Sequence, residues 1–250
     1  MSQPEKAVLI VGPGLPSSVP AGCGRVYLGD EFCERLIPSP SMLERAFAWS
    51  VANRIGLTLV TPYLSDSGIQ PFTAALAFLA GTGERIEVVV NDLGGLRLAR
   101  ERLPGRIEII LGRSLVAGAA PHVHPLPEAF LDFVVRQGIE SLEFNSLALL
   151  AVNKRGASER GLRCHVHHPF EYLAATRYCV FASEPEACLR DAIAACAREC
   201  AGRYAFLEDG GAARAHVFVK GNACFLKQHS LDGAIDADRI VDNTGLIAFP

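Results

Sequence analysis

Short runs of Val, Ile and Leu alternate with amphipathic segments along most of this chain. The apolar runs lie at residues 7–11, 25–28, 57–64, 86–90, 106–115, 139–145 and 162–174. Runs of this composition are typical of strands that are buried on both faces, as in parallel sheets. The segments between them show helical spacing, for example at Leu43, Phe47 and Val51. The alternation therefore predicts an α/β fold.

Two observations favour a TIM-type (β/α) barrel over an open sheet. The Gly12-Pro13-Gly14 turn after the first run lacks the spacing of a dinucleotide-binding fingerprint, and the length of 250 residues is near that of a typical barrel. The last fifty or so residues lack the alternation, so we expect an incomplete or distorted barrel. We expect a single domain over 1–250, with the barrel at about 5–175 and a Cys-rich segment and hairpin at about 176–250.

The C-terminal part of the chain differs in composition from the barrel region. An Ala-rich stretch from Pro185 to Cys200 predicts a helix, which would place Cys196 and Cys200 on one face at i and i+4. Residues 216–231 predict a β-hairpin around Gly221 and Asn222. The final residues, 236–250, suggest a short helical turn with an extended tail.

Charge and hydropathy exclude several classes of protein. A formal net charge of −3 argues against a nucleic-acid binder that relies on bulk charge. The sequence contains no apolar run of about 18 residues, so we expect no transmembrane helix. The first residues, MSQPEKAVLIVGPG, do not resemble a signal peptide, so we expect a cytoplasmic location. In that reducing compartment, eight cysteines indicate thiols, a metal or an iron–sulfur cluster rather than disulfides.

Four cysteines are candidate ligands of one metal centre. Cys33 follows the second strand, Cys179 follows the seventh strand region, and Cys196 and Cys200 complete the set. Four thiolates suit Zn²⁺ or an iron–sulfur cluster, and ligands spread over so much of the chain suit a cluster in a folded cavity better than zinc knuckles. Cys188 could replace one of the four, although helical spacing turns it away from Cys196 and favours a packing role.

Polar residues follow most of the predicted strands, and the carboxyl ends of barrel strands converge on one mouth. Among them, Arg113 is our candidate for binding an anionic ligand, and Glu171 is our candidate acid or base. For His167, a ligand role and a structural role remain equally open. The polar residues at the predicted strand ends are Asp30, Glu31, Thr61, Tyr63, Asn91, Asp92, Arg113, Ser114, Glu143, Asn145, His167, His168 and Glu171.

The segments YLGDEFCERL, VVVNDLGGL, LEFN and RYCVFA…CAREC together resemble the collagenase-like peptidase family, peptidase family U-thirty-two. They are most similar to its branch in oxygen-independent ubiquinone biosynthesis. The resemblance implies a (β/α) barrel and a [4Fe–4S] cluster held by cysteines that correspond to Cys33, Cys179, Cys196 and Cys200. This chain departs from the family pattern in two ways: a residue separates Arg177 from Cys179, and the gap before Cys196 is longer and contains Cys188.

The resemblance also implies a function. Family members are associated with hydroxylation without O₂, with prephenate implicated as the oxygen donor, on ubiquinone precursors, tRNA uridine or ribosomal RNA cytidine. We therefore expect an iron–sulfur subunit of an anaerobic ubiquinone hydroxylation system, paired in a heterodimer with a paralogous barrel subunit. The alternatives are an RNA hydroxylation component and a non-catalytic Fe–S or Zn scaffold. No catalytic constellation for proteolysis is visible in the sequence, so we do not expect a peptidase.

Overall fold

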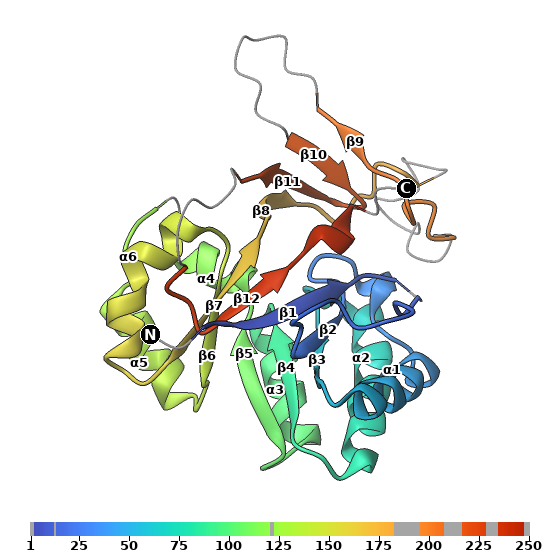
Figure 1. Cartoon of the computed structure of the whole chain (residues 1–250), viewed down its shortest axis with the longest axis horizontal. Helices are drawn as coiled ribbons and strands as arrows, with labels where there is room; N and C mark the ends of the chain where they lie inside the picture. The colour runs from blue at the N-terminus through green and yellow to red at the C-terminus, as the bar shows by residue number, and fades with distance from the viewer. Residues whose placement is uncertain are drawn as a thin grey trace.

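The computed structural model describes residues 3–12, 14–120, 123–182, 196–207, 217–228 and 235–247. Its main element is a closed barrel of eight parallel strands in the order β1-β12-β7-β6-β5-β4-β3-β2 (Figure 1). This arrangement confirms the expected TIM-type barrel. The barrel strands are β1 (Glu5–Ile10), β2 (Arg25–Gly29), β3 (Gly56–Val60), β4 (Ile86–Val90), β5 (Ile107–Leu111), β6 (Ser141–Phe144), β7 (Arg163–His168) and β12 (Arg239–Asp242).

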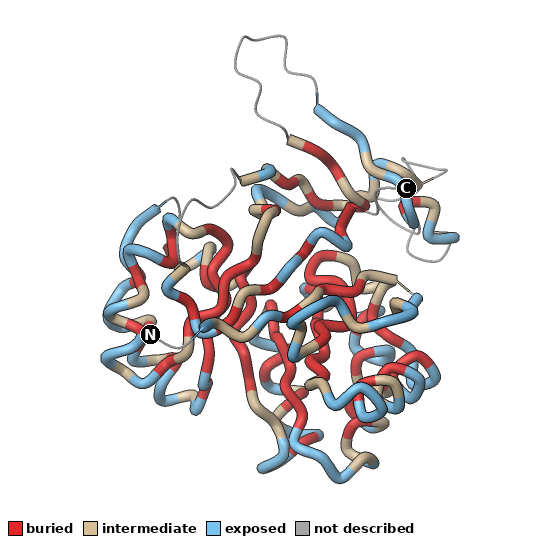
Figure 2. Tube along the Cα trace, viewed as in Figure 1, coloured by how far each residue is buried: buried red, intermediate tan, exposed pale blue. Residues whose placement is uncertain are grey.

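Helices connect the strands and pack on the outside of the barrel (Figure 1). Several begin at a side-chain cap: Ser39 accepts a hydrogen bond from the backbone of Met42, and Asp92 accepts one from Gly95. Most residues of the barrel strands are buried, whereas many residues of the helices are exposed (Figure 2). The helices are α1 (Pro40–Asn53), α2 (Asp66–Thr82), α3 (Leu93–Arg102), α4 (Arg113–Ala119), α5 (Glu128–Arg136), α6 (Leu147–Ser158) and the 3-10 helices η1 (Glu34–Leu36) and η3 (Thr244–Leu246).

The eighth strand comes from the C-terminal tail, which corrects two expectations. The barrel is closed rather than incomplete, and it extends beyond residue 175 because β12 pairs in parallel with both β1 and β7. A strand of four residues gives too weak a periodic signal to be recognised in the sequence. The tail therefore forms a strand and a 3-10 turn rather than a helical turn and an extended tail.

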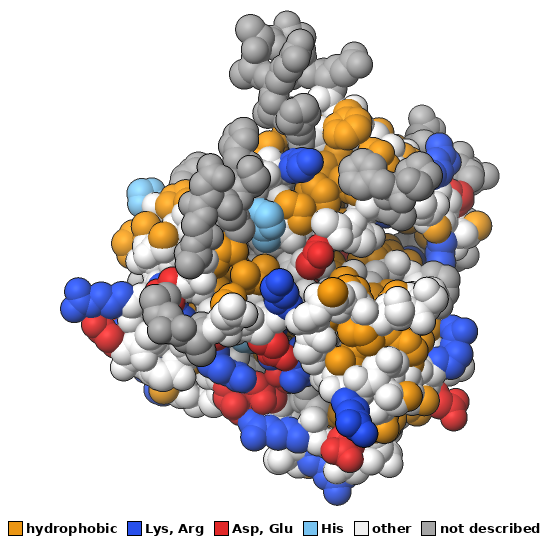
Figure 3. Space-filling view, in the orientation of Figure 1, with side chains coloured by type: hydrophobic (Ala, Val, Ile, Leu, Met, Phe, Trp, Pro, Cys, Tyr) orange, Lys and Arg blue, Asp and Glu red, His pale blue; other side chains and the backbone are white. Residues whose placement is uncertain are grey.

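A charge network inside the barrel links β12 to β1, β2 and β4. Both terminal nitrogens of Arg239 contact the Glu87 carboxylate at 2.8 and 2.9 Å, and its Nε lies 2.7 Å from Glu5. The guanidinium also donates to the hydroxyl of Tyr27 at 2.8 Å. Charged side chains of both signs also gather on the molecular surface at the end of the barrel opposite the small sheet (Figure 3). The contacts of Arg239 with Glu5, Tyr27 and Glu87 explain why the short segment Arg239–Asp242 joins the barrel.

A second, antiparallel sheet lies beyond the carboxyl ends of the barrel strands (Figure 1). Its strands are β8 (Phe170–Ala175), β9 (Ala205–Phe206), β10 (Val217–Lys220) and β11 (Ala223–Lys227), in the order β8-β11-β10-β9. The β10–β11 pair, with its turn at Gly221 and Asn222, confirms the predicted hairpin. Phe170, Phe218 and Phe225 pack in one cluster with apolar residues of the barrel strands. The sheet therefore covers the barrel mouth with aromatic side chains.

The predicted Cys-rich helix falls mostly on residues 183–195, outside the described part of the chain, and so does Cys188. Its described end is not helical. Residues 196–198 have no regular secondary structure and residues 199–200 lie in a turn, and Arg198 has a left-handed φ of 63°. That conformation interrupts helical geometry, so Cys196 and Cys200 do not stand at i and i+4 of a helix. No helix in the described ranges has the length and apolar character needed to span a membrane.

Candidate four-cysteine site

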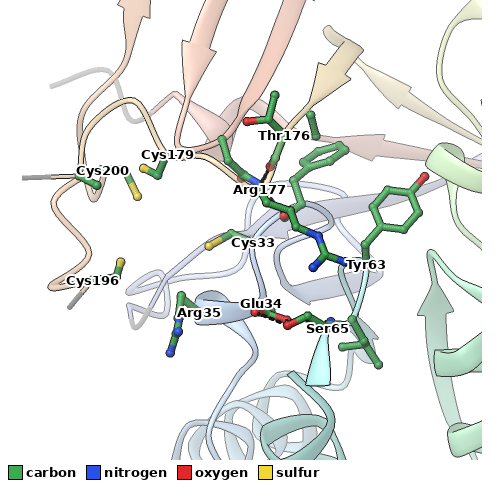
Figure 4. A pocket seen from close by; sticks show the side chains of 15 residues that line it. Cys33, Glu34, Arg35, Tyr63, Ser65, Thr176, Arg177, Cys179, Cys196 and Cys200 are labelled. Atoms are coloured by element: carbon green, nitrogen blue, oxygen red, sulfur yellow. Dashed lines mark hydrogen bonds between the residues drawn. The ribbon is translucent and has the colours of Figure 1, made fainter. Parts of the chain in front are cut away.

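A cavity of about 340 Å³ opens beside the covered mouth of the barrel. It is bounded by the loops after β2 and β3 and by the two segments 175–182 and 196–200 (Figure 4). Cys33, Cys179, Cys196 and Cys200 all line it, and Figure 4 shows their sulfur atoms directed toward a shared space at one end. The folded chain thus brings together the four cysteines selected from the sequence.

Cys33 is positioned by the loop that follows β2. The carboxylate of Asp30 accepts hydrogen bonds from the backbone N–H groups of Phe32 and Cys33, both at 2.7 Å, and so closes a tight turn. Burial, followed by the charge of Asp30, raises the pKa of the Cys33 thiol to about 12. With no cation bound, this sulfur remains a thiol at neutral pH.

Cys179 and Cys200 lie within hydrogen-bonding distance of each other. The hydrogen bond from Cys200 lowers the pKa of Cys179 to about 6, whereas the same contact and burial raise the pKa of Cys200. The pair therefore shares one proton at neutral pH, with the thiolate on Cys179. Cys196 accepts a hydrogen bond from the backbone N–H of Arg198 at 3.4 Å. The left-handed Arg198 turns the chain so that Cys196 and Cys200 line the same cavity.

The spacing of the sulfurs bears on which centre these cysteines could hold. Zn²⁺ with tetrahedral Zn–S bonds of about 2.3 Å holds its sulfurs about 3.8 Å apart. Within the described ranges, the only group of three or more potential metal ligands whose atoms all lie within 4.8 Å of one another contains no cysteine. The thiolates of a [4Fe–4S] cluster bind different irons and so stand farther apart than those of one ion. Cys179 and Cys200 are close, but the four sulfurs as a set do not form the compact tetrahedron of a single zinc ion, and their soft donor character suits either centre.

Arg113 does not line this cavity. Its side chain is fully buried, and its Nε and Nη2 contact the Glu31 carboxylate at distances of 2.7–3.0 Å. The guanidinium also donates to the carbonyl of Phe170 at 2.9 Å and lies over the rings of Phe32 and Phe225. The structure therefore gives Arg113 an internal carboxylate partner in place of the free anionic ligand that we expected.

Glu171 lies on β8, opposite Leu226 of β11, and is not among the residues that line the cavity. It is half-buried, and burial raises the pKa of its carboxyl group despite the opposing charge of Arg113. An elevated pKa is compatible with acid–base chemistry. It lies on the covering sheet, however, and does not line the cavity with the four cysteines.

A second group of potential ligands lies inside the barrel, where Glu31, Glu143 and His167 have donor atoms within 4.8 Å of one another. Nε2 of His167 is 3.1 Å from Glu143 and Nδ1 is 3.8 Å from Glu31. Burial raises the pKa of Glu143 to about 8 and lowers that of His167 to about 3. The charges of these three residues are therefore balanced without a metal ion. Glu143 carries a proton, and Arg113 neutralises Glu31.

Some cavity residues were not recognised as candidates in the sequence. Arg35 and Arg177 bring guanidinium groups to the wall, and Asn222 reaches it from the hairpin turn. Tyr63, in the loop after β3, is the only member of our set of polar strand-end residues among those that line the cavity. The sequence around Asn222 indicates only a turn. No local pattern connects Asn222 with Cys33, which lies 189 positions earlier in the sequence.

The fold and the site define a (β/α) barrel protein with a lateral four-cysteine cavity. A search of protein-family models finds no match to this chain, and no curated protein matches it significantly.

Proposed function

We propose that Cys33, Cys179, Cys196 and Cys200 hold a [4Fe–4S] cluster, and that the protein is the iron–sulfur subunit of an oxygen-independent hydroxylation system in ubiquinone biosynthesis. The observation that carries the proposal is the convergence of four cysteines, from separate parts of the chain, on one cavity. The resemblance of the cysteine-bearing segments to the ubiquinone branch of the collagenase-like peptidase family supplies the reaction. A bound cluster would supply one-electron redox chemistry at this site.

The part of the cavity away from the sulfurs has the character of a ligand site. Phe32, Tyr63 and Leu64 provide apolar walls, and Figure 4 shows the Arg177 side chain extending toward Tyr63. We propose that this region accepts a small anionic ligand such as prephenate or a cyclic quinone precursor. Arg177 and Arg35 would bind its carboxylate in the role that we first assigned to Arg113. The ring of such a ligand would pack on the aromatic wall.

The covered barrel mouth favours an active site that is completed by a second subunit. In most barrel enzymes the substrate enters at the carboxyl ends of the strands, but here Phe170, Phe218 and Phe225 occupy that position. We propose that a paralogous barrel subunit completes the active site in a heterodimer. A non-catalytic Fe–S scaffold role is the alternative that the same covered mouth favours.

Anaerobic purification with iron and sulfide quantitation tests the cluster. We expect about four irons and four sulfides per chain and a brown protein whose broad visible absorption bleaches on reduction. Replacing Cys33, Cys179, Cys196 or Cys200 by Ser should abolish that absorption. Cys224→Ser is the matched control, because Cys224 lies on β11 and does not line the cavity. A colourless protein with stoichiometric zinc would contradict the proposal.

The same experiment decides between Cys188 and Cys196 as the remaining ligand. Cys196 lines the cavity with the other three cysteines, whereas Cys188 lies outside the described residues. We expect Cys188→Ser to keep its iron and its colour and Cys196→Ser to lose both. The opposite result would exchange the two assignments and leave the cluster itself in place.

A further inference from the structure

The turn of the β10–β11 hairpin contacts every cysteine-bearing segment of the site. Nδ2 of Asn222 donates to the carbonyl of Phe32 at 2.8 Å, 190 positions away in the sequence and adjacent to Cys33. The same nitrogen donates to the carbonyl of Thr176 at 2.5 Å, and the Asn222 carbonyl accepts from the Thr176 N–H at 2.9 Å. One side chain therefore ties the Cys33 loop to the strand end that leads to Cys179.

Lys220 connects the same turn to the third segment. Its ammonium group donates to the carbonyl of Cys200 at 2.7 Å, and it lies close enough to Cys200, Asp30 and Cys179 to interact with them electrostatically. Gly221, between Lys220 and Asn222, lies next to Cys200, because an added Cβ would be in ordinary van der Waals contact with the Cys200 sulfur at 3.9 Å. The positive φ of Gly221, 60°, allows both flanking side chains to reach the site.

These contacts have two different physical consequences for a bound cluster. Asn222 sets the separation of two loops that each carry one ligand, and a ligand set that is held in place before binding retains its metal centre more firmly. Lys220 places a positive charge beside a centre whose four thiolates make it anionic. A nearby cation stabilises the more negative, reduced form and so raises the reduction potential.

We propose that Asn222 and Lys220 are positioning residues for the four-cysteine site, with Asn222 holding the Cys33 and Cys179 segments together and Lys220 anchoring Cys200 and raising the reduction potential. This inference rests on the proposed cluster. It assigns to the hairpin turn a role that is separate from its part in covering the barrel mouth.

Three anaerobically purified variants test the two residues. Asn222→Asp keeps the side-chain shape but removes the donor nitrogen, Lys220→Met removes the charge, and Lys220→Arg restores it. Lys227→Met is the matched control, because Lys227 is an exposed lysine at the other end of the same hairpin. Iron content, the rate of iron loss to a chelator and the midpoint potential from an EPR-monitored titration are measured on each, and circular dichroism checks folding.

We expect Asn222→Asp to lose iron to the chelator about tenfold faster than the wild type. At the wild-type midpoint, Lys220→Met should show an approximately tenfold lower ratio of reduced to oxidised cluster, equivalent to about 59 mV for one electron. Lys220→Arg and Lys227→Met should resemble the wild type.

Normal iron retention in Asn222→Asp together with an unchanged midpoint in Lys220→Met, in a wild type that holds its cluster, would overturn this inference alone. If Asn222→Asp fails to fold, the Lys220 variants decide, and an unchanged midpoint then overturns it. A wild type without iron and sulfide would overturn both this inference and the proposed function.

Discussion

The guanidinium of Arg113 and the carboxylate of Glu31 form an ion pair enclosed within the barrel, with 2.7 Å between Nη2 and Oε2. Both side chains are no more than 1% exposed, and the pair joins the first residue of α4 to the loop after β2. Aromatic rings of Phe32 and Phe225 flank the guanidinium. The pair lies between the barrel interior and the covering sheet. Because Glu31 belongs to the loop that carries Cys33, the pair fixes that loop to the barrel.

Removing the Arg113 side chain should lower the free energy of unfolding rather than weaken the binding of a ligand. Arg113→Met leaves the Glu31 charge buried without a partner, which typically costs about 3–5 kcal/mol. Adding Glu31→Leu to the same protein should restore much of that loss, because apolar replacements of a buried pair are often tolerated. Urea unfolding of the two variants measures both effects. Arg97→Ala, which breaks an exposed pair with Glu101 on α3, is the control and should change little.

A different result would contradict this role. If Arg113→Met unfolds at the same urea concentration as the wild type but binds small carboxylates more weakly, Arg113 binds the anionic ligand, as the sequence first suggested.

The buried carboxyl group of Glu143 predicts a pH dependence of stability. Its folded pKa is raised by burial from 4.5 to about 8, so the folded protein keeps a proton that the unfolded chain releases. The stability that this group contributes is complete at low pH and is lost as the pH rises toward 8. His167, whose pKa is lowered by burial from 6.5 to about 3, has the opposite effect below pH 6.5. Between pH 6.5 and 8 the lowered pKa of Cys179 acts in the opposite direction, so the contribution of Glu143 is obtained by comparison with a variant that leaves Cys179 unchanged.

Glu143→Gln, which is neutral throughout, should lack the decline between pH 6.5 and 8 that Glu143 contributes to the urea midpoint of the wild type. Glu44→Gln, on the exposed side of α1, should keep it. If the wild type and Glu143→Gln show the same pH dependence over this range, Glu143 is ionised in the folded state, as it would be with a cation bound beside His167.

Gly29 ends β2 in a conformation that other residues rarely adopt. Its φ is 128°, and a Cβ at this position would lie 2.4 Å from the carbonyl oxygen of Val60. Gly29→Ala should therefore lower the free energy of unfolding by more than about 1 kcal/mol. Gly81→Ala is the matched control, since Gly81 lies within α2 with open space around it. It should raise stability by about 0.5–1 kcal/mol. Equal effects of the two substitutions in thermal denaturation would contradict this explanation.

The barrel and the hairpin were predictable because their signals are local. Runs such as Ile86–Val90, buried along its whole length, carry the apolar composition of a parallel strand in five adjacent residues. The turn at Gly221 and Asn222 likewise marks a hairpin within its own neighbourhood. The strand β12 was not predicted from the sequence. Its position in the barrel depends on contacts of Arg239 with Glu5 and Glu87, which are distant in the sequence.

The sequence alone determined the class of fold and selected the four cysteines, because periodicity and residue type are properties of the chain itself. Only the tertiary structure decided what surrounds each side chain. It enclosed Arg113 with Glu31, turned the chain at Arg198 where a helix was expected, and brought Asn222 between the Cys33 and Cys179 segments. The physical reason is that burial and hydrogen-bond partners depend on contacts between distant residues, and such contacts leave no mark in local composition.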